Sequence, residues 1–243
     1  MIDYDNPMGG FHSMRGYYFL VKEQVIEQDM FYKDHNVLHY TIKYPLFISD
    51  TYHMLAQKLN TLYKTKAVMF ERSDIMNLYQ MAMVEYEYSV ANDFPIRPFE
   101  VYVNYEVTYN QNCALSLYFD QYEYTGGAHG LTYRYSDTWN LAKSKKEELT
   151  DFFPNTTDVM EFVINNIIEQ IELENKKGDS IYFEDYPQRV RESIKKNNFY
   201  LSKDGLVIYF QQYDIAPYSS GIPNFLIPYS PLGAEEPTCP YYI

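Results

Sequence analysis

Tyr122-Glu-Tyr-Thr-Gly-Gly-Ala-His-Gly-Leu-Thr-Tyr-Arg-Tyr135 sets the pattern around which the rest of the chain is arranged. Large apolar residues alternate with polar ones on both sides of its glycine-rich centre, as Phe119 before it and Leu131 and Tyr133 after it illustrate. Because side chains of a strand point alternately to its two faces, this pattern around a turn-rich segment is typical of an antiparallel hairpin. We therefore predict two paired strands joined by the loop Thr125 to Gly130.

The loop itself allows two interpretations. Gly126, Gly127 and Gly130 permit positive φ angles or a close approach of the backbone to a neighbour. His129 lies among them, where its ring could face a ligand. In the alternative, the glycines only make the turn and His129 bonds to a backbone carbonyl, since turns are the commonest use of glycine. The sequence leaves both open.

Strand-like and helix-like patterns follow one another beyond this hairpin. Alternating runs predict strands over residues 17–28, 37–44, 99–109, 113–124, 131–141, 199–202, 206–213 and 222–229. Apolar residues spaced three and four apart predict helices between residues 46 and 93, 158 and 178, and 185 and 194. We therefore expect an α+β protein of two packed subdomains, each an antiparallel sheet with helices on one face.

Proline residues place the boundaries between these elements. Phe94-Pro-Ile-Arg-Pro98 contains two prolines, which forbid helix and favour an extended connector. Pro45 is expected to end the second strand, and the long helical region is expected to form either one long helix or two helices that break near Ser73 and Asp74. The predicted organisation is a flexible arm over 1–15, an N-terminal α+β subdomain over 16–94, a C-terminal α+β subdomain over 95–232 and an irregular tail over 233–243.

The cysteine and methionine residues do not identify a functional site. The two cysteines make neither a disulfide framework nor a zinc site. We expect Cys113 to be a small buried apolar residue in a strand and Cys239 to be exposed in a proline-rich tail. The methionines of the long helical region fill core gaps in the favoured interpretation and line a binding groove in the alternative. They are Met69, Met76, Met81 and Met83.

The composition excludes some partners and favours others. A net charge of −13 disfavours nucleic acid, because phosphate binding needs clustered Lys and Arg. An acidic field attracts basic partners, although solubility alone would also explain it. The 28 tyrosines suit half-buried strands and offer surfaces for carbohydrate or protein.

Export signals are missing from the sequence. It has no run of about 18 apolar residues that would span a membrane. Its first residues lack the basic start and apolar stretch of a secretory signal. Either the protein is cytoplasmic, or the chain is an extracytoplasmic piece that begins after a removed anchor.

Motifs for catalysis and metal binding are missing as well. The sequence lacks HExxH, GxSxG, GxGxxG and a phosphate-binding loop, and His35 and His39 have no third ligand for zinc. One alternative to a non-enzymatic protein remains, in which two carboxylates hydrolyse a glycoside. The candidate carboxylates are Asp120, Glu123 and Asp214. We expect no enzymatic activity, no metal and no cofactor.

A second notable stretch is Tyr213-Asp-Ile-Ala-Pro-Tyr-Ser-Ser-Gly221. Asp214 can accept hydrogen bonds from nearby backbone N–H groups, and Pro217 restricts the path of the chain. The rings of Tyr213 and Tyr218 could face a ligand, or they could be buried in a structural corner.

These two stretches together resemble the RsiV-type sensor domain family. The residues that carry the resemblance are Tyr124-Thr-Gly-Gly-Ala-His-Gly130 and Tyr209-Phe-Gln-Gln-Tyr-Asp-Ile-Ala-Pro-Tyr-Ser-Ser-Gly221. The domain is the C-terminal part of the anti-sigma factor RsiV and also stands beside the catalytic domain of the peptidoglycan deacetylase PdaC. In this bacterial family a small α+β domain precedes it, which is similar to residues 17 to about 93, so the resemblance covers nearly the whole chain.

The resemblance implies binding rather than catalysis. In RsiV the domain binds lysozyme outside the cell, and we find neither a sigma-binding segment nor deacetylase motifs in this sequence. It implies a non-enzymatic module for lysozyme, another basic protein or another cell-wall-associated ligand. The alternative is a peptidoglycan- or glycan-binding module, or an accessory domain of a cell-wall hydrolase or deacetylase. The implied ligand-binding residues are Tyr124, Thr125, Gly126, Gly127, His129, Tyr213, Asp214 and Tyr218.

Overall fold

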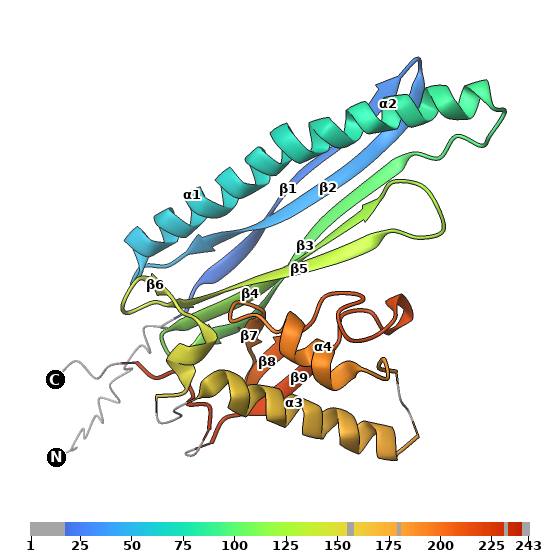
Figure 1. Ribbon diagram of the computed structural model, residues 1–243. Coiled ribbons are helices and arrows are strands. Elements are labelled where there is room, and N and C mark those ends of the chain that lie inside the picture. Colours follow the sequence, from blue (N-terminus) through green and yellow to red (C-terminus); the bar gives the residue numbers. More distant parts are fainter. Residues whose placement is uncertain (1–17, 155–157, 179–180, 231–232, 240–243) are drawn as a thin grey trace, which may run out of the picture.

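The computed structural model describes residues 18–154, 158–178, 181–230 and 233–239, and shows an α+β fold built on two sheets (Figure 1). The large sheet has the order β1 (Leu20–Tyr32), β2 (His35–Ile48), β3 (Phe99–Gln111), β4 (Ala114–Tyr124), β5 (Leu131–Asn140) and β6 (Lys145–Lys146). The small sheet has the order β7 (Phe199–Leu201), β8 (Gly205–Tyr209) and β9 (Asn224–Pro228). The predicted α+β class is confirmed, and the predicted arm over 1–15 lies outside the described residues.

Helices cover the outer faces of both sheets. A long helix made of α1 (His53–Phe70), a π-helical turn (Glu71–Ile75) and α2 (Met76–Ala91) lies along the large sheet. The π-helical turn falls where the sequence predicts a break, at Ser73 and Asp74. The helices α3 (Val159–Lys176) and α4 (Tyr186–Ser193) accompany the small sheet, and Asp158 caps α3 by accepting from Glu161 N (3.0 Å).

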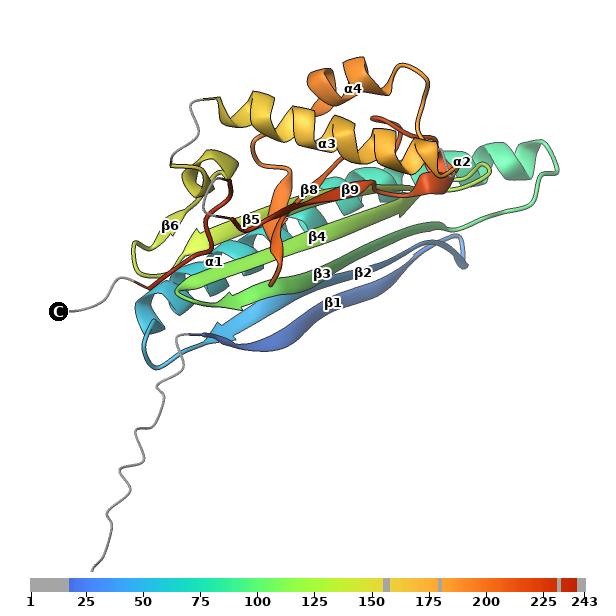
Figure 2. The same ribbon diagram turned by 90° about the horizontal axis from the view of Figure 1, so that it is seen from below.

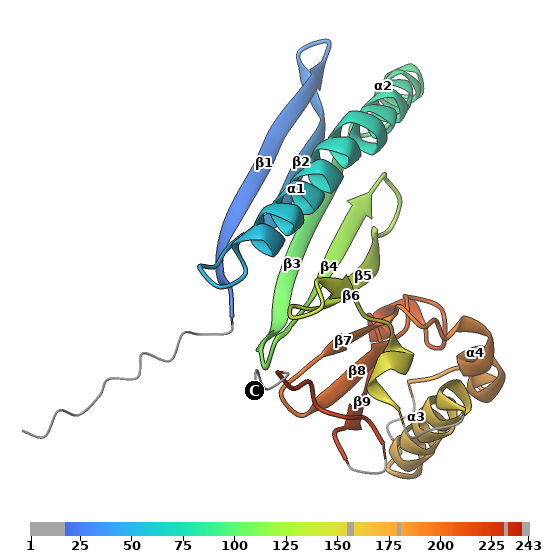
Figure 3. The ribbon, with the colours of Figure 1, turned by 90° about the vertical axis from the view of Figure 1, so that its left-hand side faces the viewer.

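The two sheets pack on each other at the β4–β5 end of the large sheet. Figures 2 and 3 show the long helix on one face of the large sheet, and the small sheet with α3 beyond it on the other. Side chains of the large sheet bond directly to β7: Ser116 Oγ accepts from Leu201 N (2.9 Å), and Ser136 Oγ donates to Phe199 O (2.6 Å). These bonds fix the small sheet against β4 and β5.

The predicted hairpin around the glycine-rich loop is present. β4 and β5 pair antiparallel, with Phe119 opposite Tyr135 and Glu123 opposite Leu131. The rings of Phe119 and Tyr135 stack with centroids 4.9 Å apart on the face covered by the long helix. The hairpin therefore supplies both a pair of core rings and the loop that leaves the sheet at residue 125.

The connector Phe94 to Pro98 joins the long helix to β3, which lies beside β2 in the large sheet. β2 and β3 pair in parallel from Leu38 opposite Phe99 to Ile42 opposite Val103, and the long helix makes the crossover between them. The other neighbouring strands of this sheet are antiparallel. The predicted boundary between residues 94 and 95 therefore lies within one sheet, whose two parts share one hydrophobic core.

The expectation that Pro45 ends the second strand is wrong. β2 continues to Ile48, and Pro45 lies opposite Glu23 of β1. The pairing of β2 with β3 ends at Ile42, so Pro45 lies where β2 has one free side, and a missing N–H is tolerated at such an edge.

The methionines of the long helix do not fill the core. Met69, Met76 and Met81 are 64%, 42% and 55% exposed. The buried stripe of the helix runs instead through residues such as Tyr63, Ala67 and, further on, Leu78. The methionines fall outside this stripe, because only residues about 3.6 positions apart share a helix face.

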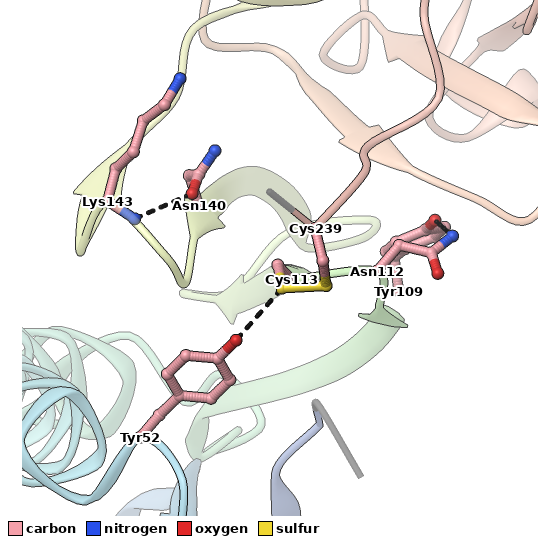
Figure 4. The surroundings of a disulfide bond; sticks show 7 residues. All are labelled: Tyr52, Tyr109, Asn112, Cys113, Asn140, Lys143 and Cys239. Carbon is pink, nitrogen blue, oxygen red and sulfur yellow. Dashed lines mark hydrogen bonds between the residues drawn. A yellow bond between two sulfur atoms is a disulfide. The ribbon is translucent and has the colours of Figure 1, made fainter. Parts of the chain in front are cut away.

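Cys113 is buried as predicted, but the prediction that the two cysteines form no disulfide is wrong. Cys113 and Cys239 form a disulfide across 126 residues of sequence (Figure 4). Cys113 lies in the two-residue turn between β3 and β4, with a positive φ of 56°, rather than inside a strand. The C-terminal segment returns to this turn, where Glu236 accepts from Asn112 Nδ2 (3.0 Å) and from Tyr109 Oη (3.3 Å).

Candidate functional site

The two motifs meet at the outer edge of β5. Gln211 Oε1 accepts from Arg134 N (2.9 Å), and Gln211 Nε2 donates to Arg134 O (2.6 Å). The next residue, Gln212, accepts from Thr132 N through Oε1 (2.7 Å). Side-chain amides thus take the place of a neighbouring strand, and they hold the segment after β8 against the base of the glycine-rich loop.

An aromatic stack forms where these segments meet. The ring of His129 lies on the ring of Tyr218, with centroids 3.7 Å apart and an angle of 15° between the planes. Tyr213 lies next to Tyr218, with ring centroids 6.1 Å apart, and 46% of Tyr213 is exposed. Three of the predicted ligand-binding residues, from parts of the chain about 80 residues apart, therefore form one surface.

His129 both stabilises the loop through a hydrogen bond and presents its ring at the surface. Its Nδ1 donates to the carbonyl oxygen of Gly130 (3.0 Å), so the geometry places the ring proton on that nitrogen. One ring edge therefore stabilises the loop, as in the structural interpretation. The ring is nevertheless exposed at the surface, where it stacks on Tyr218.

The glycines of the loop have two different uses. Gly126 and Gly127 have φ angles of +95° and +85°, which L side chains rarely adopt. Gly130 instead lacks space, because a Cβ there would lie 2.4 Å from Glu123 O and 2.6 Å from the ring of Tyr122. The loop is held further by Tyr124, whose hydroxyl donates to Gly127 O (3.2 Å).

Asp214 and Thr125 are not part of this aromatic surface. Asp214 Oδ2 accepts from Gln211 N (2.8 Å), and burial raises the pKa of this carboxyl above its usual value. Its contact shapes the turn that leads to Tyr218. Thr125 lines a separate hollow of about 580 Å³ beside α2, with Met81, Val84 and others.

The carboxylates considered for hydrolysis have other partners. Asp120 receives two hydrogen bonds from Arg134, at 2.7 and 2.6 Å. Glu123 accepts from Gln121 Nε2 (2.6 Å). Because side chains alternate along β4, Asp120 and Glu123 lie on opposite faces of the sheet, and Asp214 is bound in its own turn. The structure therefore does not bring two of these three carboxylates together across a common site.

The structure also contains a cavity that the sequence analysis missed. It has a volume of about 450 Å³ and lies between the long helix and strands β2 to β5. It is lined by Ile42, Lys43, Tyr44, Tyr63, Lys66, Ala67, Met69, Phe70, Ser73, Asp74, Val103, Phe119, Gln121 and Tyr135. No motif predicts it, because these residues come from five separate elements, although the methionine alternative placed Met69 in a groove.

A charged cluster adjoins this cavity at Tyr63 and Lys66. Asp137, which is buried, accepts from Tyr63 Oη (3.1 Å) and pairs with Lys66 Nζ (3.2 Å) and with Lys146. Trp139 Nε1 donates to Tyr63 Oη (3.0 Å). Burial and the neighbouring Asp137 raise the pKa of Tyr63 well above its usual value, so its hydroxyl stays protonated.

Within the described ranges of the chain, no three His, Cys, Asp or Glu side chains gather as metal ligands would. His35 bonds to Lys33 O (2.9 Å), whereas His39 bonds to Asp29 (2.9 Å). In the same ranges, no helix combines the length and the apolar character that crossing a membrane requires.

Two family models match consecutive parts of the chain. Residues 32–132 match the family described as deacetylase PdaC, and residues 150–230 match the protein family of unknown function DUF3298. The peptidoglycan-N-acetylmuramic acid deacetylase PdaC of Bacillus subtilis (strain 168) is 27% identical over 120 residues. That match spans 48% of this chain but only 25% of the relative's length.

Solved structures of DUF3298 proteins share the fold. A member of that family from Bacteroides fragilis superposes with a TM-score of 0.70 at 20% identity, covering 88% of this chain and 92% of the other. A second, from Pseudomonas aeruginosa PAO1, gives a TM-score of 0.55 at 16% identity, covering 90% and 95%. The chain is therefore similar to PdaC in its N-terminal half and to the DUF3298 family in its C-terminal part and in its fold.

Proposed function

We propose that this chain is a non-enzymatic recognition module for a cell-wall-associated ligand, with a basic protein of the lysozyme class as its first candidate partner. The stack of His129 on Tyr218 carries the proposal, since it joins the two motifs into one surface. Aromatic side chains at such a position supply large contact area with little loss of conformational freedom, and Tyr is enriched where interfaces bind most tightly.

Charge supports a basic partner. The chain carries a net charge of −13, which speeds the encounter with a cationic protein and raises affinity at low salt. The relative from Bacillus subtilis is named for an activity on peptidoglycan, which supports a setting at the cell wall. The disulfide Cys113–Cys239 agrees with that setting, because disulfides persist mainly in oxidising, extracytoplasmic compartments.

The arrangement of the carboxylates supports a role without catalysis. A glycosidase needs two carboxyl groups facing one another across a substrate. Here Asp120 is bound to Arg134 on one face of β4, and Glu123 lies on the other. We therefore assign binding, and no reaction, to the surface formed by His129 and Tyr218.

Calorimetric titration with a c-type lysozyme tests the proposal, at low salt and again at about 0.3 M salt, where exposed charges are largely screened. We expect binding that persists at the higher salt and weakens about tenfold or more in His129→Ala and Tyr218→Ala, as for residues at the centre of an interface. Val25→Ala is the matched control, because Val25 is exposed on β1 at the opposite edge of the large sheet.

Three results would contradict the proposal. Failure of the wild-type chain to bind would remove lysozyme as the partner. Binding that disappears at the higher salt would be attraction between net charges alone. Equal affinity of His129→Ala, Tyr218→Ala and the control would place the contact somewhere else.

A further inference from the structure

The cavity between the long helix and the large sheet has the size and lining of a ligand site. Its volume of about 450 Å³ lies within the usual range of small-molecule pockets, roughly 300–1,000 Å³. One wall is a single stripe of the helix, with Tyr63, Lys66, Phe70 and Ser73 at spacings of three and four. The floor comes from the strands β2 to β5, which lie beside α1 in Figure 1.

Aromatic rings make up much of this lining, and two of them carry hydroxyls without a protein partner. Tyr44 and Tyr135 are half-buried in the wall. Within the part of the chain that the structure describes, neither hydroxyl has a hydrogen-bond partner. Neither oxygen is sealed from solvent, so each hydroxyl is free to bond to a ligand that enters the cavity. Burial raises the pKa of Tyr135, which keeps its hydroxyl a donor at neutral pH.

Polar and charged side chains also line the cavity, next to these rings. Gln121 donates from Nε2 to Glu123, which leaves its carbonyl oxygen available in the cavity. The π-helical turn brings Ser73 and Asp74 to the wall, where Ser73 Oγ donates to Asp74 Oδ2 and Asp74 retains a second oxygen. π-helical turns inside α-helices occur frequently at functional sites. Lys66 completes the set, with its ammonium over the rings of Tyr63 and Tyr135 at 5.6 and 5.8 Å.

We propose that this cavity binds a glycan chain, with the ring of Tyr44 packing against sugar and with the Tyr135 hydroxyl, Gln121 and Asp74 bonding to sugar hydroxyls. The C–H groups on the face of a sugar ring suit the negative face of an aromatic ring. Sugar hydroxyls both donate and accept, so they fit a site that offers Tyr hydroxyls, an amide oxygen and a carboxylate. This site is separate from the surface of His129 and Tyr218, and the inference does not depend on the proposed partner.

A peptide ligand fits the cavity less well. Peptides that add a strand need a free sheet edge, but here the sheet presents its face. The edge of β5 has its N–H groups at Thr132 and Arg134 bonded to Gln212 and Gln211. Beyond Ile42, the free side of β2 includes Pro45, which has no N–H to offer. An amphipathic helix needs a continuous apolar groove, whereas Lys43, Lys66, Asp74 and Gln121 interrupt this one.

Titration of the whole chain with a chitin-derived tetrasaccharide, followed by NMR of ¹⁵N-labelled protein, tests the inference. We expect saturable shifts of the backbone amides of Gln121 and Tyr135. Affinity should fall at least fivefold in Gln121→Ala and in Tyr135→Phe, which removes only the hydroxyl and keeps the packed ring. Gln188→Ala, on the exposed surface of α4, should bind like the wild type.

His129→Ala separates this site from the one proposed above. It should bind the saccharide with unchanged affinity, whatever it does to lysozyme binding. Saturable shifts confined to residues outside the cavity would overturn the inference. So would undiminished affinity in both Gln121→Ala and Tyr135→Phe, or the lack of any saturable shift in the wild-type chain.

Discussion

Single glycines of the same loop act through different physical effects. Gly126 has open space where a Cβ would stand, but its φ of +95° is unfavourable for other residues. For Gly130 the obstacle is contact, since a Cβ would collide with the carbonyl oxygen of Glu123 and with the ring of Tyr122. A motif shows only that glycines are present, whereas the structure shows what each one does.

We expect Gly130→Ala to lower the free energy of unfolding by about 1–3 kcal/mol, the usual cost of forcing extra atoms into a packed site. A backbone oxygen at 2.4 Å cannot rotate away, so β4 or the loop must move. Urea denaturation followed by circular dichroism measures the change. Ala128→Ser, on an exposed residue of the same loop, is the control and should stay within about 0.5 kcal/mol of the wild type. Equal stability of Gly130→Ala and the wild type would show that the loop accommodates a methyl group.

At the scale of elements, the outer edge of β5 is closed by side chains. An unpaired strand edge can pair with another chain, and proteins cover such edges in several ways. Here the amides of Gln211 and Gln212 occupy backbone groups of Arg134 and Thr132. This explains why β8 ends at Tyr209. The sequence pattern predicts a strand as far as residue 213, but the chain turns these glutamines toward β5.

We expect Gln211→Ala to lower the free energy of unfolding by about 1–3 kcal/mol, because it leaves two partly buried backbone groups of Arg134 without partners. Urea denaturation gives the size of the effect, and hydrogen exchange at the Arg134 amide gives its location. Gln212→Ala removes one bond, to Thr132 N, and should cost less. Unchanged protection of the Arg134 amide in Gln211→Ala would contradict this account of the edge.

At the scale of the whole molecule, the disulfide ties the C-terminal segment to the large sheet. Cys239 bonds to Cys113 in the turn between β3 and β4, and Glu235 N donates to Phe152 O (2.8 Å) close by. A crosslink across 126 residues restricts the unfolded chain strongly, in the entropic account of disulfide stabilisation. The C-terminal segment thereby connects the β3–β4 turn with Phe152, which is buried in the hydrophobic core beside the small sheet.

We expect Cys113→Ser and Cys239→Ser each to lower the free energy of unfolding by about 2–5 kcal/mol, the usual effect of losing a native disulfide. Urea denaturation with and without reductant measures it. Reductant should destabilise the wild type by a similar amount and leave both variants unchanged. If the reduced wild type, verified by thiol titration, unfolds at the same urea concentration as the oxidised form, the bond does not stabilise the fold.

Local patterns in the sequence determine the elements. The alternation around the glycine-rich loop predicts the β4–β5 hairpin, helical spacing predicts the long helical region, and Asp158 marks the start of α3. These predictions are confirmed because period and capping depend on neighbours within a few residues. The resemblance between motifs also selects His129, Tyr213 and Tyr218, which the fold brings together.

The tertiary structure alone decides how distant segments meet. Four features leave no local pattern in the sequence. They are the parallel pairing of β2 with β3, the contact of Gln211 with Arg134 77 residues away, the disulfide between Cys113 and Cys239, and the cavity lined from five elements. Each depends on packing two sheets and a crossover helix in one arrangement, and periodicity along a chain carries no information about which faces come together. The sequence by itself therefore determines the elements and the loop, and tertiary packing decides the surface of His129 and Tyr218 and the cavity beside Tyr135.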